Sequence, residues 1–299
     1  MSSYIVAVVT GANKGIGKAI VRNLVFYHAN NIPSLKTSTL IVYLTARNNL
    51  RGLSATNEIN QELDSKKLLV ENGGVARVLF HQLDITDDES VQKMRDDVQK
   101  AFGGFDILIN NAAIGPEFLG ESFSPTVAKK TLDTNYWGLI KTTEILLPVI
   151  KYPGGKIINI ASRFSQIKQI PSKKLQTEFS REDLSLEELN ELMRKFEKHT
   201  NSGVTVQEGW PTSGTVSYNV SKVGMLAYTK ILARRLANEK KQICIQAVNP
   251  GWVRTDMGSE KAPLSADQGA ETPVYLALSN DPRLEKNGQF WTRKQPEEW

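Results

Sequence analysis

Short runs rich in β-branched residues alternate with amphipathic stretches along most of this chain, beginning at residue 4. The runs have the length of buried strands, and the stretches between them have helical periodicity. Strands are expected at Tyr4–Thr10, Leu40–Thr45, Arg77–Leu83, Asp106–Asn110, Lys156–Ile160 and Ile243–Val248, with a weaker seventh at Gln289–Trp291. Helices are expected at Gly15–Tyr27, Ser54–Val70, Asp87–Phe102, Lys129–Val149, Ser217–Asn238 and Ala266–Leu278. This alternation predicts the α/β class, with a doubly wound parallel sheet of about seven strands.

The chain has 299 residues and no Pro/Gly-rich linker, so we predict one domain spanning residues 1–299. Within it, residues 163–217 form an insertion with an amphipathic helix predicted at Leu186–His199. Ser185-Leu-Glu-Glu188 has the spacing of a capping box before that helix, and Thr86-Asp-Asp-Glu89 has it before the third helix. The segment Asn30–Thr39 is expected to be a surface loop.

The composition excludes several classes of protein. A single cysteine, Cys244, excludes an internal disulfide framework, and we expect it to be a small buried side chain. The three histidines have no partners at metal-ligand spacing, so no metal site is expected. The net charge is +5, but the basic residues are scattered among acidic ones, so no nucleic-acid partner is expected. The apolar runs are too short to span a membrane and no secretory signal is evident, so a cytoplasmic location is expected.

A glycine-rich turn, Thr10-Gly-Ala-Asn-Lys-Gly-Ile-Gly17, joins the first strand to the first helix. Glycines allow a tight turn and let backbone N–H groups approach a pyrophosphate, while the helix N-terminus favours negative charge. The spacing is G-x-x-x-G-x-G, and a sharp β–α turn without a ligand is the alternative interpretation. Its place after the first strand of an α/β chain favours a dinucleotide site of Rossmann type.

The charge pattern around the second strand indicates which dinucleotide binds. An NAD site usually places a carboxylate on the ribose 2′-OH near the end of this strand, yet no Asp or Glu occurs from Lys18 to Asn57. Arg47 stands just beyond the strand and Lys14 lies in the glycine turn, so a 2′-phosphate would meet two cations. We therefore predict NADP(H), with a solvent-exposed Arg47 of no special role as the alternative.

Tyr218 and Lys222 are four residues apart at the start of a predicted helix, so their side chains share a face. An ammonium near a phenol favours the phenolate and lowers a pKa that starts at about 10. Tyr218 would then act as a proton donor and acceptor. A Tyr and a Lys at this spacing are usually an exposed pair, so they indicate a catalytic site only together with other motifs.

Together these motifs resemble those of the short-chain dehydrogenase/reductase family, from one end of the chain to the other. The resemblance rests on Thr10–Gly17, Leu83–Ile85, Asn110-Asn-Ala-Ala113, Thr134-Asn-Tyr-Trp-Gly138, Ser162, Tyr218 with Lys222, and Asn249-Pro-Gly-Trp-Val-Arg-Thr-Asp256. Within the family, the insertion before Tyr218, Glu208-Gly-Trp-Pro211, Pro250–Met257 and the stretch Glu271–Leu278 most resemble monomeric NADPH-dependent carbonyl reductases.

This resemblance implies reduction of ketones, aldehydes and quinones, with a catalytic set of Asn135, Ser162, Tyr218 and Lys222. Tyr218 would protonate the carbonyl oxygen that Ser162 holds, Lys222 would bind the nicotinamide ribose, and Asn135 would position a water. The implied cofactor-binding residues are Gly11, Asn13, Lys14, Gly15, Ile16, Gly17, Arg47, Asp84, Ile85, Asn111, Tyr218, Lys222, Pro250, Gly251, Val253 and Thr255, with Thr255 reaching the carboxamide. Trp210, Trp252 and Met257 would line the substrate pocket.

Three positions depart from the family pattern. Ala113 replaces a usual glycine, and Arg163 follows Ser162, either facing the pocket or, as we expect, solvent. Val248 and Asn249 stand where related carbonyl reductases often have a cysteine that engages glutathione, which puts glutathione adducts as substrates in doubt. A dedicated steroid, prostaglandin or pteridine-like ketone reductase and a non-catalytic NADP-binding sensor remain alternatives.

We also predict a monomer. The helix Ser217–Asn238 has two apolar stripes, Val220/Val223/Ala227/Ile231 and Met225/Tyr228/Leu232/Leu236, on different faces. One stripe can pack on the sheet. The inserted helix, with Leu186, Leu189, Met193 and Phe196, is expected to cover the other, where related enzymes place a second subunit.

Overall fold

A computed structural model describes residues 3–31, 38–212 and 214–299, so most of the predicted loop Asn30–Thr39 lies outside the described residues. The described strands form one sheet with the order β3-β2-β1-β4-β5-β6-β7-β8. Their bounds are β1 Ser3–Val9, β2 Ser38–Ala46, β3 Ala76–Gln82, β4 Ile107–Asn110, β5 Gly155–Ile160, β6 Ile243–Asn249, β7 Phe290–Thr292 and β8 Gln295–Glu297. All pairs are parallel except β7 with β8, which confirms the doubly wound parallel sheet.

The seventh strand is confirmed, and the eighth is absent from our prediction. β8 is three residues long, exposed and contains Pro296, so it lacks the apolar pattern that marks a strand. Proline is tolerated there because an edge strand need not donate a hydrogen bond on its outer side.

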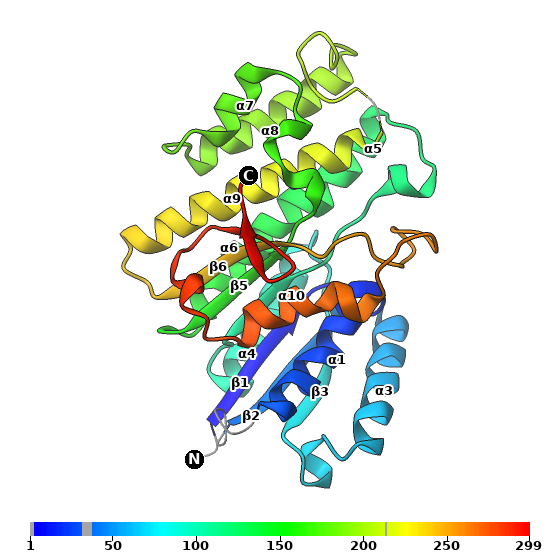
Figure 1. Cartoon of the computed structure of the whole chain (residues 1–299), viewed down its shortest axis with the longest axis vertical. Helices are drawn as coiled ribbons and strands as arrows, with labels where there is room; N and C mark the ends of the chain where they lie inside the picture. The colour runs from blue at the N-terminus through cyan, green and yellow to red at the C-terminus, as the bar shows by residue number, and fades with distance from the viewer. Residues whose placement is uncertain (1–2, 32–37, 213) are drawn as a thin grey trace.

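Helices cover both faces of the sheet (Figure 1). α1 (Gly15–Asn30), α3 (Asn49–Ser65) and α10 (Ala266–Leu278) pack with one apolar cluster. α4 (Asp88–Phe102), α6 (Leu139–Leu146) and α9 (Val216–Asn238) pack with the other. Each face of the sheet therefore has its own core, as expected for a parallel sheet buried on both sides.

The starts of α3 and α4 differ from the prediction. α3 begins at Asn49, five residues before the predicted Ser54, because the Asn48 side chain accepts a hydrogen bond from the Arg51 N–H. The predicted capping box Thr86–Glu89 is wrong, since Asp87 is the N-cap of α4. The Thr86 hydroxyl donates to Asp84 instead, at 2.7 Å.

The predicted helix Lys129–Val149 is interrupted. It consists of α5 (Pro125–Leu132), a π-helical segment Asp133–Gly138, α6, and a 3-10 turn at Leu147–Val149. Ser124 caps α5 and Pro125 occupies its first turn. Such π segments are frequent at functional sites, and this one contains Asn135.

The insertion folds onto α9. It holds 3-10 turns at Arg163–Ser165 and Ile167–Gln169, α7 (Lys173–Ser180), which we did not predict, and α8 (Leu186–Asn201). The capping box of Ser185 and Glu188 is confirmed. α8 packs against α5 and α9, where a β-carbon added at Gly224 would lie 2.9 Å from the Met193 sulfur.

Candidate functional site

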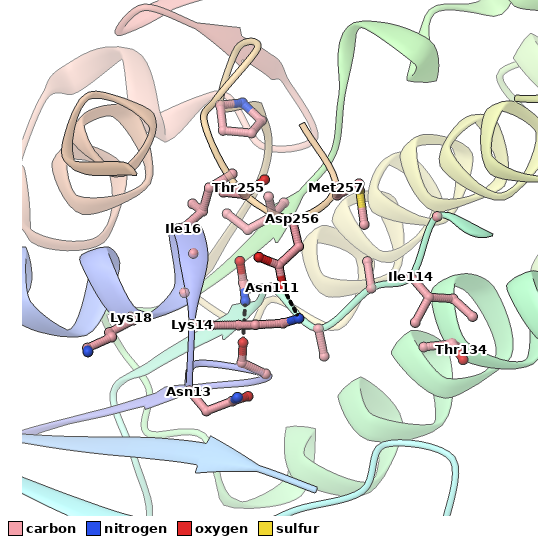
Figure 2. Close-up of a pocket in the computed structure, with 18 of the residues that line it drawn as sticks. Asn13, Lys14, Ile16, Lys18, Asn111, Ile114, Thr134, Thr255, Asp256 and Met257 are labelled. Atoms are coloured by element: carbon pink, nitrogen blue, oxygen red, sulfur yellow. Dashed lines mark hydrogen bonds and ion pairs between the residues drawn. The ribbon is translucent and has the colours of Figure 1, made fainter. Parts of the chain in front are cut away.

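A cleft of about 880 Å³ opens at the carboxyl ends of the central strands (Figure 2). It is the place where ligands bind in open α/β sheets. Predicted residues that line it are Gly11, Asn13, Lys14, Gly15, Ile16, Gly17, Arg47, Asp84, Ile85, Asn111, Tyr218, Lys222, Pro250, Thr255 and Met257. Residues that we did not predict include Asn48, Arg51, Thr86, Ile114, Leu119 and Glu121. The fold thus brings most of the sequence motifs to one cleft.

The glycine turn has a geometry that only glycine adopts readily. Gly11 and Gly15 have φ of +61° and +54°, and a β-carbon at Gly17 would lie 2.4 Å from the Asn111 amide nitrogen. No side chain caps α1, so the N–H groups of its first turn are available to an anion. Asn111 holds the turn by donating to the carbonyls of Thr10 and Gly11. These features fit a dinucleotide pyrophosphate.

The end of the cleft beyond β2 carries exposed cations. The Arg47 side chain is 78% exposed, and its Nε lies 3.9 Å from Asp84. Arg51 lies close by in the first turn of α3, whereas Lys14 forms an ion pair of 2.5 Å with Asp256 from the loop after β6 (Figure 2). Arg51 escaped the sequence analysis because α3 begins earlier than predicted. Arg47 and Arg51 together fit a 2′-phosphate.

Tyr218 and Lys222 lie at the opposite end, in the first turns of α9. Both are almost completely buried, and the Ser162 side chain lies near enough to Tyr218 for its hydroxyl to lower the pKa of the phenol. Lys222 Nζ donates to the Ile160 carbonyl at 2.7 Å and lies 5.5 Å from the centre of the Tyr218 ring. The predicted catalytic residues Ser162, Tyr218 and Lys222 therefore form one group, although Ser162 is not itself among the cleft-lining residues.

The expected lowering of the Tyr218 pKa is wrong. Burial raises the pKa of Tyr218 to about 12, and the hydrogen bond from Ser162 offsets only part of that rise. Burial also lowers the pKa of Lys222 to about 7. The reason is that removal from water disfavours the charged form of each group.

Asn135 lies beneath the cleft and does not line it. Its amide nitrogen donates to the Ile114 carbonyl and to Ser221 Oγ, and its oxygen accepts from the Ile114 N–H at 2.8 Å. Asn135 thereby fixes the segment after β4 against α9. Its predicted role in holding a water remains a prediction.

Trp210 does not line the cleft, contrary to our expectation. It is fully buried in the insertion, packs against Phe179 and Phe196, and donates from Nε1 to His199 at 3.1 Å. No local sequence motif indicated that Trp210 packs against the helices of the insertion. Trp210 is a core residue of the insertion.

Some of the residues predicted to form the site from the loop after β6 line the cleft, and others do not. Met257 and Thr255 line the cleft, whereas Trp252 is 52% exposed and Val253 is buried beneath the loop. Gly251, with φ of +86°, shapes the turn and does not line the cleft. Trp252, Gly251 and Val253 thus support the loop instead of lining the cleft.

Arg163 and Cys244, to which we gave no catalytic role, have surroundings that differ from those of the site residues. Arg163 is exposed and its guanidinium lies over the Phe164 ring, while Cys244 is partly buried in β6. In the described part of the chain, no group of His, Cys, Asp or Glu is arranged to hold a metal ion. No described helix is long and apolar enough to cross a membrane.

Comparisons with known proteins agree with this geometry. Residues 5–172 match the short chain dehydrogenase family. The chain is 40% identical over 303 residues to carbonyl reductase [NADPH] 1 of Homo sapiens, with 100% of both chains covered. The Bos taurus protein of that name is 39% identical, with 100% of this chain and 99% of that protein covered.

Two solved structures have a similar fold. Salutaridine reductase from Papaver somniferum superposes with a TM-score of 0.80 at 25% identity, covering 96% of this chain and 99% of that one. Menthone neomenthol reductase from Mentha piperita has a TM-score of 0.76 at 29% identity, covering 97% and 99%. With a glycine turn, a buried Tyr218/Lys222 pair and relatives matched along the whole chain, this protein belongs to the short-chain dehydrogenase/reductase family.

Proposed function

We propose that this chain reduces ketones, aldehydes and quinones to alcohols with NADPH. The observation that carries the proposal is the group of Ser162 with the buried Tyr218 and Lys222 at one end of a cleft whose other end carries the glycine turn and Arg47. The human and bovine relatives, named as NADPH carbonyl reductases, support the same activity.

Bound NADPH supplies the hydride that adds to the carbonyl carbon. Tyr218 donates its proton to the carbonyl oxygen, completing the alcohol, and its raised pKa of about 12 keeps that proton in place until charge develops on the oxygen. The Ser162 hydroxyl holds the oxygen by a hydrogen bond. Both donors stand ready in a buried site, where they stabilise the developing charge more than water would.

Lys222 binds the nicotinamide ribose and responds to the charge on Tyr218. With a pKa near 7, its amine exchanges a proton close to neutral pH. Once Tyr218 has lost its proton, the phenolate favours the ammonium form of Lys222. The pair thus limits the net charge in the site during turnover.

A panel of quinones, aromatic ketones, steroids and prostaglandin-like ketones tests this function. We expect NADPH-dependent reduction with a shallow spread of kcat/KM across the panel. One member with a sharply higher kcat/KM favours the dedicated biosynthetic reductase. NADPH binding without turnover on any member contradicts the proposal and favours the sensor.

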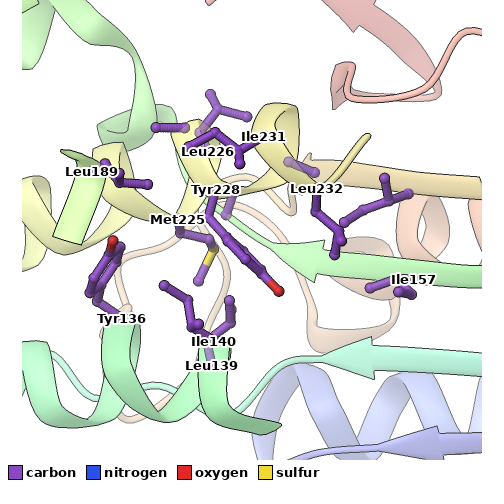
Figure 3. Packing of buried hydrophobic residues seen from close by; sticks show 14 of the residues in the cluster. Tyr136, Leu139, Ile140, Ile157, Leu189, Met225, Leu226, Tyr228, Ile231 and Leu232 are labelled. Atoms are coloured by element: carbon purple, nitrogen blue, oxygen red, sulfur yellow. The ribbon is translucent and has the colours of Figure 1, made fainter. Parts of the chain in front are cut away.

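We also propose that the protein is a monomer. Both apolar stripes of α9 are buried, and Figure 3 shows Met225 and Tyr228 directed from α9 toward Leu139 and Ile140 on α6. α8 packs against α5 and α9 with Leu189, Met193 and Phe196 buried. Light scattering with size-exclusion chromatography is expected to give one species near 33.3 kDa, and a stable dimer contradicts the proposal.

The cytoplasmic location remains a prediction from the sequence.

A further inference from the structure

A short 3-10 helix between β4 and α5, η2 (Pro116–Leu119), reaches the start of α9. It follows the segment after β4 that lines the cleft. The Glu117 carboxylate in η2 accepts a hydrogen bond from the Ser217 N–H at 2.8 Å. Ser217 immediately precedes Tyr218, so this contact joins two parts of the site that are 100 residues apart in the sequence.

The start of α9 needs such an acceptor. The first N–H groups of a helix have no partners within the helix, and an N-cap side chain usually accepts from one of them. Thr215, the N-cap residue of α9, makes no such bond, because its hydroxyl donates to the Asn219 side chain at 2.8 Å. Glu117 therefore replaces the missing cap, and its negative charge suits the positive end of the helix dipole.

The next residue of η2 contacts Tyr218 itself. The Phe118 ring meets the Tyr218 ring edge-on, with centroids 4.9 Å apart and an interplanar angle of 84°. Phe118 also lies 5.9 Å from Phe164, in the turn that follows Ser162. One short helix thus contacts both the backbone before Tyr218 and the ring of Tyr218.

We infer that Glu117 is a positioning residue for Tyr218, an inference that rests on the proposed reductase function. By fixing the first turn of α9, its carboxylate keeps the Tyr218 hydroxyl within reach of Ser162 and of a substrate carbonyl. Small displacements of a proton donor reduce the rate strongly, because catalysis depends on its orientation. Loss of this contact should therefore lower kcat and leave NADPH binding intact.

The surroundings of Glu117 suggest an informative conservative variant. Its second oxygen, Oε2, and the Ser217 hydroxyl are both buried without a hydrogen-bond partner among the described residues. Glu117→Gln keeps one oxygen as an acceptor for the Ser217 N–H and removes the negative charge. We expect this variant to retain the parental kcat, because positioning of Tyr218 needs the acceptor, whereas the charge contributes only to the stability of the helix start.

Glu117→Met removes the acceptor while keeping the length of the side chain. We expect kcat for carbonyl reduction to fall about tenfold, with the dissociation constant of NADPH unchanged. In the Tyr218→Phe background the same substitution should cause no further loss, because Glu117 acts through Tyr218. Glu117→Asp, which withdraws the carboxylate by one methylene, should fall in between and carries the test if Glu117→Met does not fold.

Glu144→Met is the matched control. Glu144 also holds α9, accepting from Tyr228 at 2.8 Å and pairing with Arg235 at 2.9 Å, but farther along the helix from Tyr218. It should lower stability without lowering kcat of the folded protein. The inference is overturned if Glu117→Met keeps the parental kcat, if Glu117→Gln loses as much as Glu117→Met, or if Glu144→Met loses as much. An inactive parent would instead refute the proposed function, so the two failures are distinguishable.

Discussion

Burial moves the pKa values of Tyr218 and Lys222 in opposite directions. The phenol keeps its proton to about pH 12, and the amine loses its proton near pH 7. Both shifts favour the neutral forms, as desolvation requires. Tyr218 therefore holds a proton that it can donate, and a negative charge on Tyr218 favours the return of a proton to Lys222.

This arrangement predicts how stability depends on pH. The pKa of Lys222 is about 7 in the folded protein and about 10.5 when exposed, so between these values the unfolded chain binds more protons. The free energy of unfolding of the cofactor-free parent should therefore rise with pH across that window relative to that of Lys222→Met. Below the window, the destabilisation that comes from burying the charged amine should be at its full value. Urea unfolding at pH 7 and at higher pH measures the difference; a constant difference contradicts the pKa shift.

Arg47 provides a second prediction at this scale. NADPH should be preferred over NADH by at least about tenfold in kcat/KM, because a charged pair with the 2′-phosphate is absent for NADH. Arg47→Asp should narrow or invert the preference. Arg77→Asp, an exposed arginine on β3 that pairs with Glu71, is the control and should leave it unchanged. Equal kcat/KM for the two cofactors in the parent would exclude the NADP assignment.

Single residues were predictable from the sequence where a motif fixes their role. Tyr218, Lys222 and the glycine turn belong to such motifs. Arg51, Glu117 and the burial of Trp210 do not, because each depends on a helix start or a tertiary contact far away in the sequence. The pKa of Tyr218 was predicted in the wrong direction because spacing reveals its charged neighbour and not the depth of burial.

At the scale of elements, the strands were the most predictable. Their β-branched runs recur between helical stretches, and six strands and the seventh appear close to the expected positions. The π segment at Asp133–Gly138 could not be predicted, because it changes backbone hydrogen bonds without changing the apolar periodicity. α8 was predictable, since its capping box and apolar face are both local signals.

The packing of α8 can be tested with leucines of opposite burial. Leu189→Ala removes a fully buried side chain and should lower the free energy of unfolding by about 2–5 kcal/mol, through lost burial and the cavity left behind. Leu53→Ala on α3, where Leu53 is 46% exposed, should change it by less than about 0.5 kcal/mol. Similar losses in denaturant unfolding of the two variants would contradict the packing of α8.

At the scale of the whole molecule, the sheet order places the glycine turn, Ser162 and the start of α9 together at the carboxyl ends of the strands. Parallel strands joined by helices bring their carboxyl ends together, so the alternation in the sequence already implied one shared site. The sequence predicted that the inserted helix lies on α9, and it did not indicate α7 or the contact of α8 with α5. That arrangement depends on the buried surfaces of α7 and α8 meeting those of α5 and α9.

Cofactor binding should stabilise the whole fold. A ligand at 100 times its dissociation constant adds about 2.7 kcal/mol to the stability of the state that binds it. NADPH should therefore raise the melting temperature of the parent and of Tyr218→Phe equally, and NADH should raise it less at the same concentration. Thermal unfolding with each cofactor measures this; a shift that depends on Tyr218 contradicts the separation of binding from proton transfer.

The central claim is that Tyr218 donates the proton in NADPH-dependent carbonyl reduction. The most direct measurement is the initial rate of NADPH oxidation with a quinone and an aromatic ketone for the parent, Tyr218→Phe and the exposed control Tyr152→Phe. Tyr218→Phe should lose roughly 10²–10⁴-fold in kcat while its NADPH affinity is unchanged, and Tyr152→Phe should match the parent. A Tyr218→Phe variant that keeps most of the parental rate would contradict the mechanism.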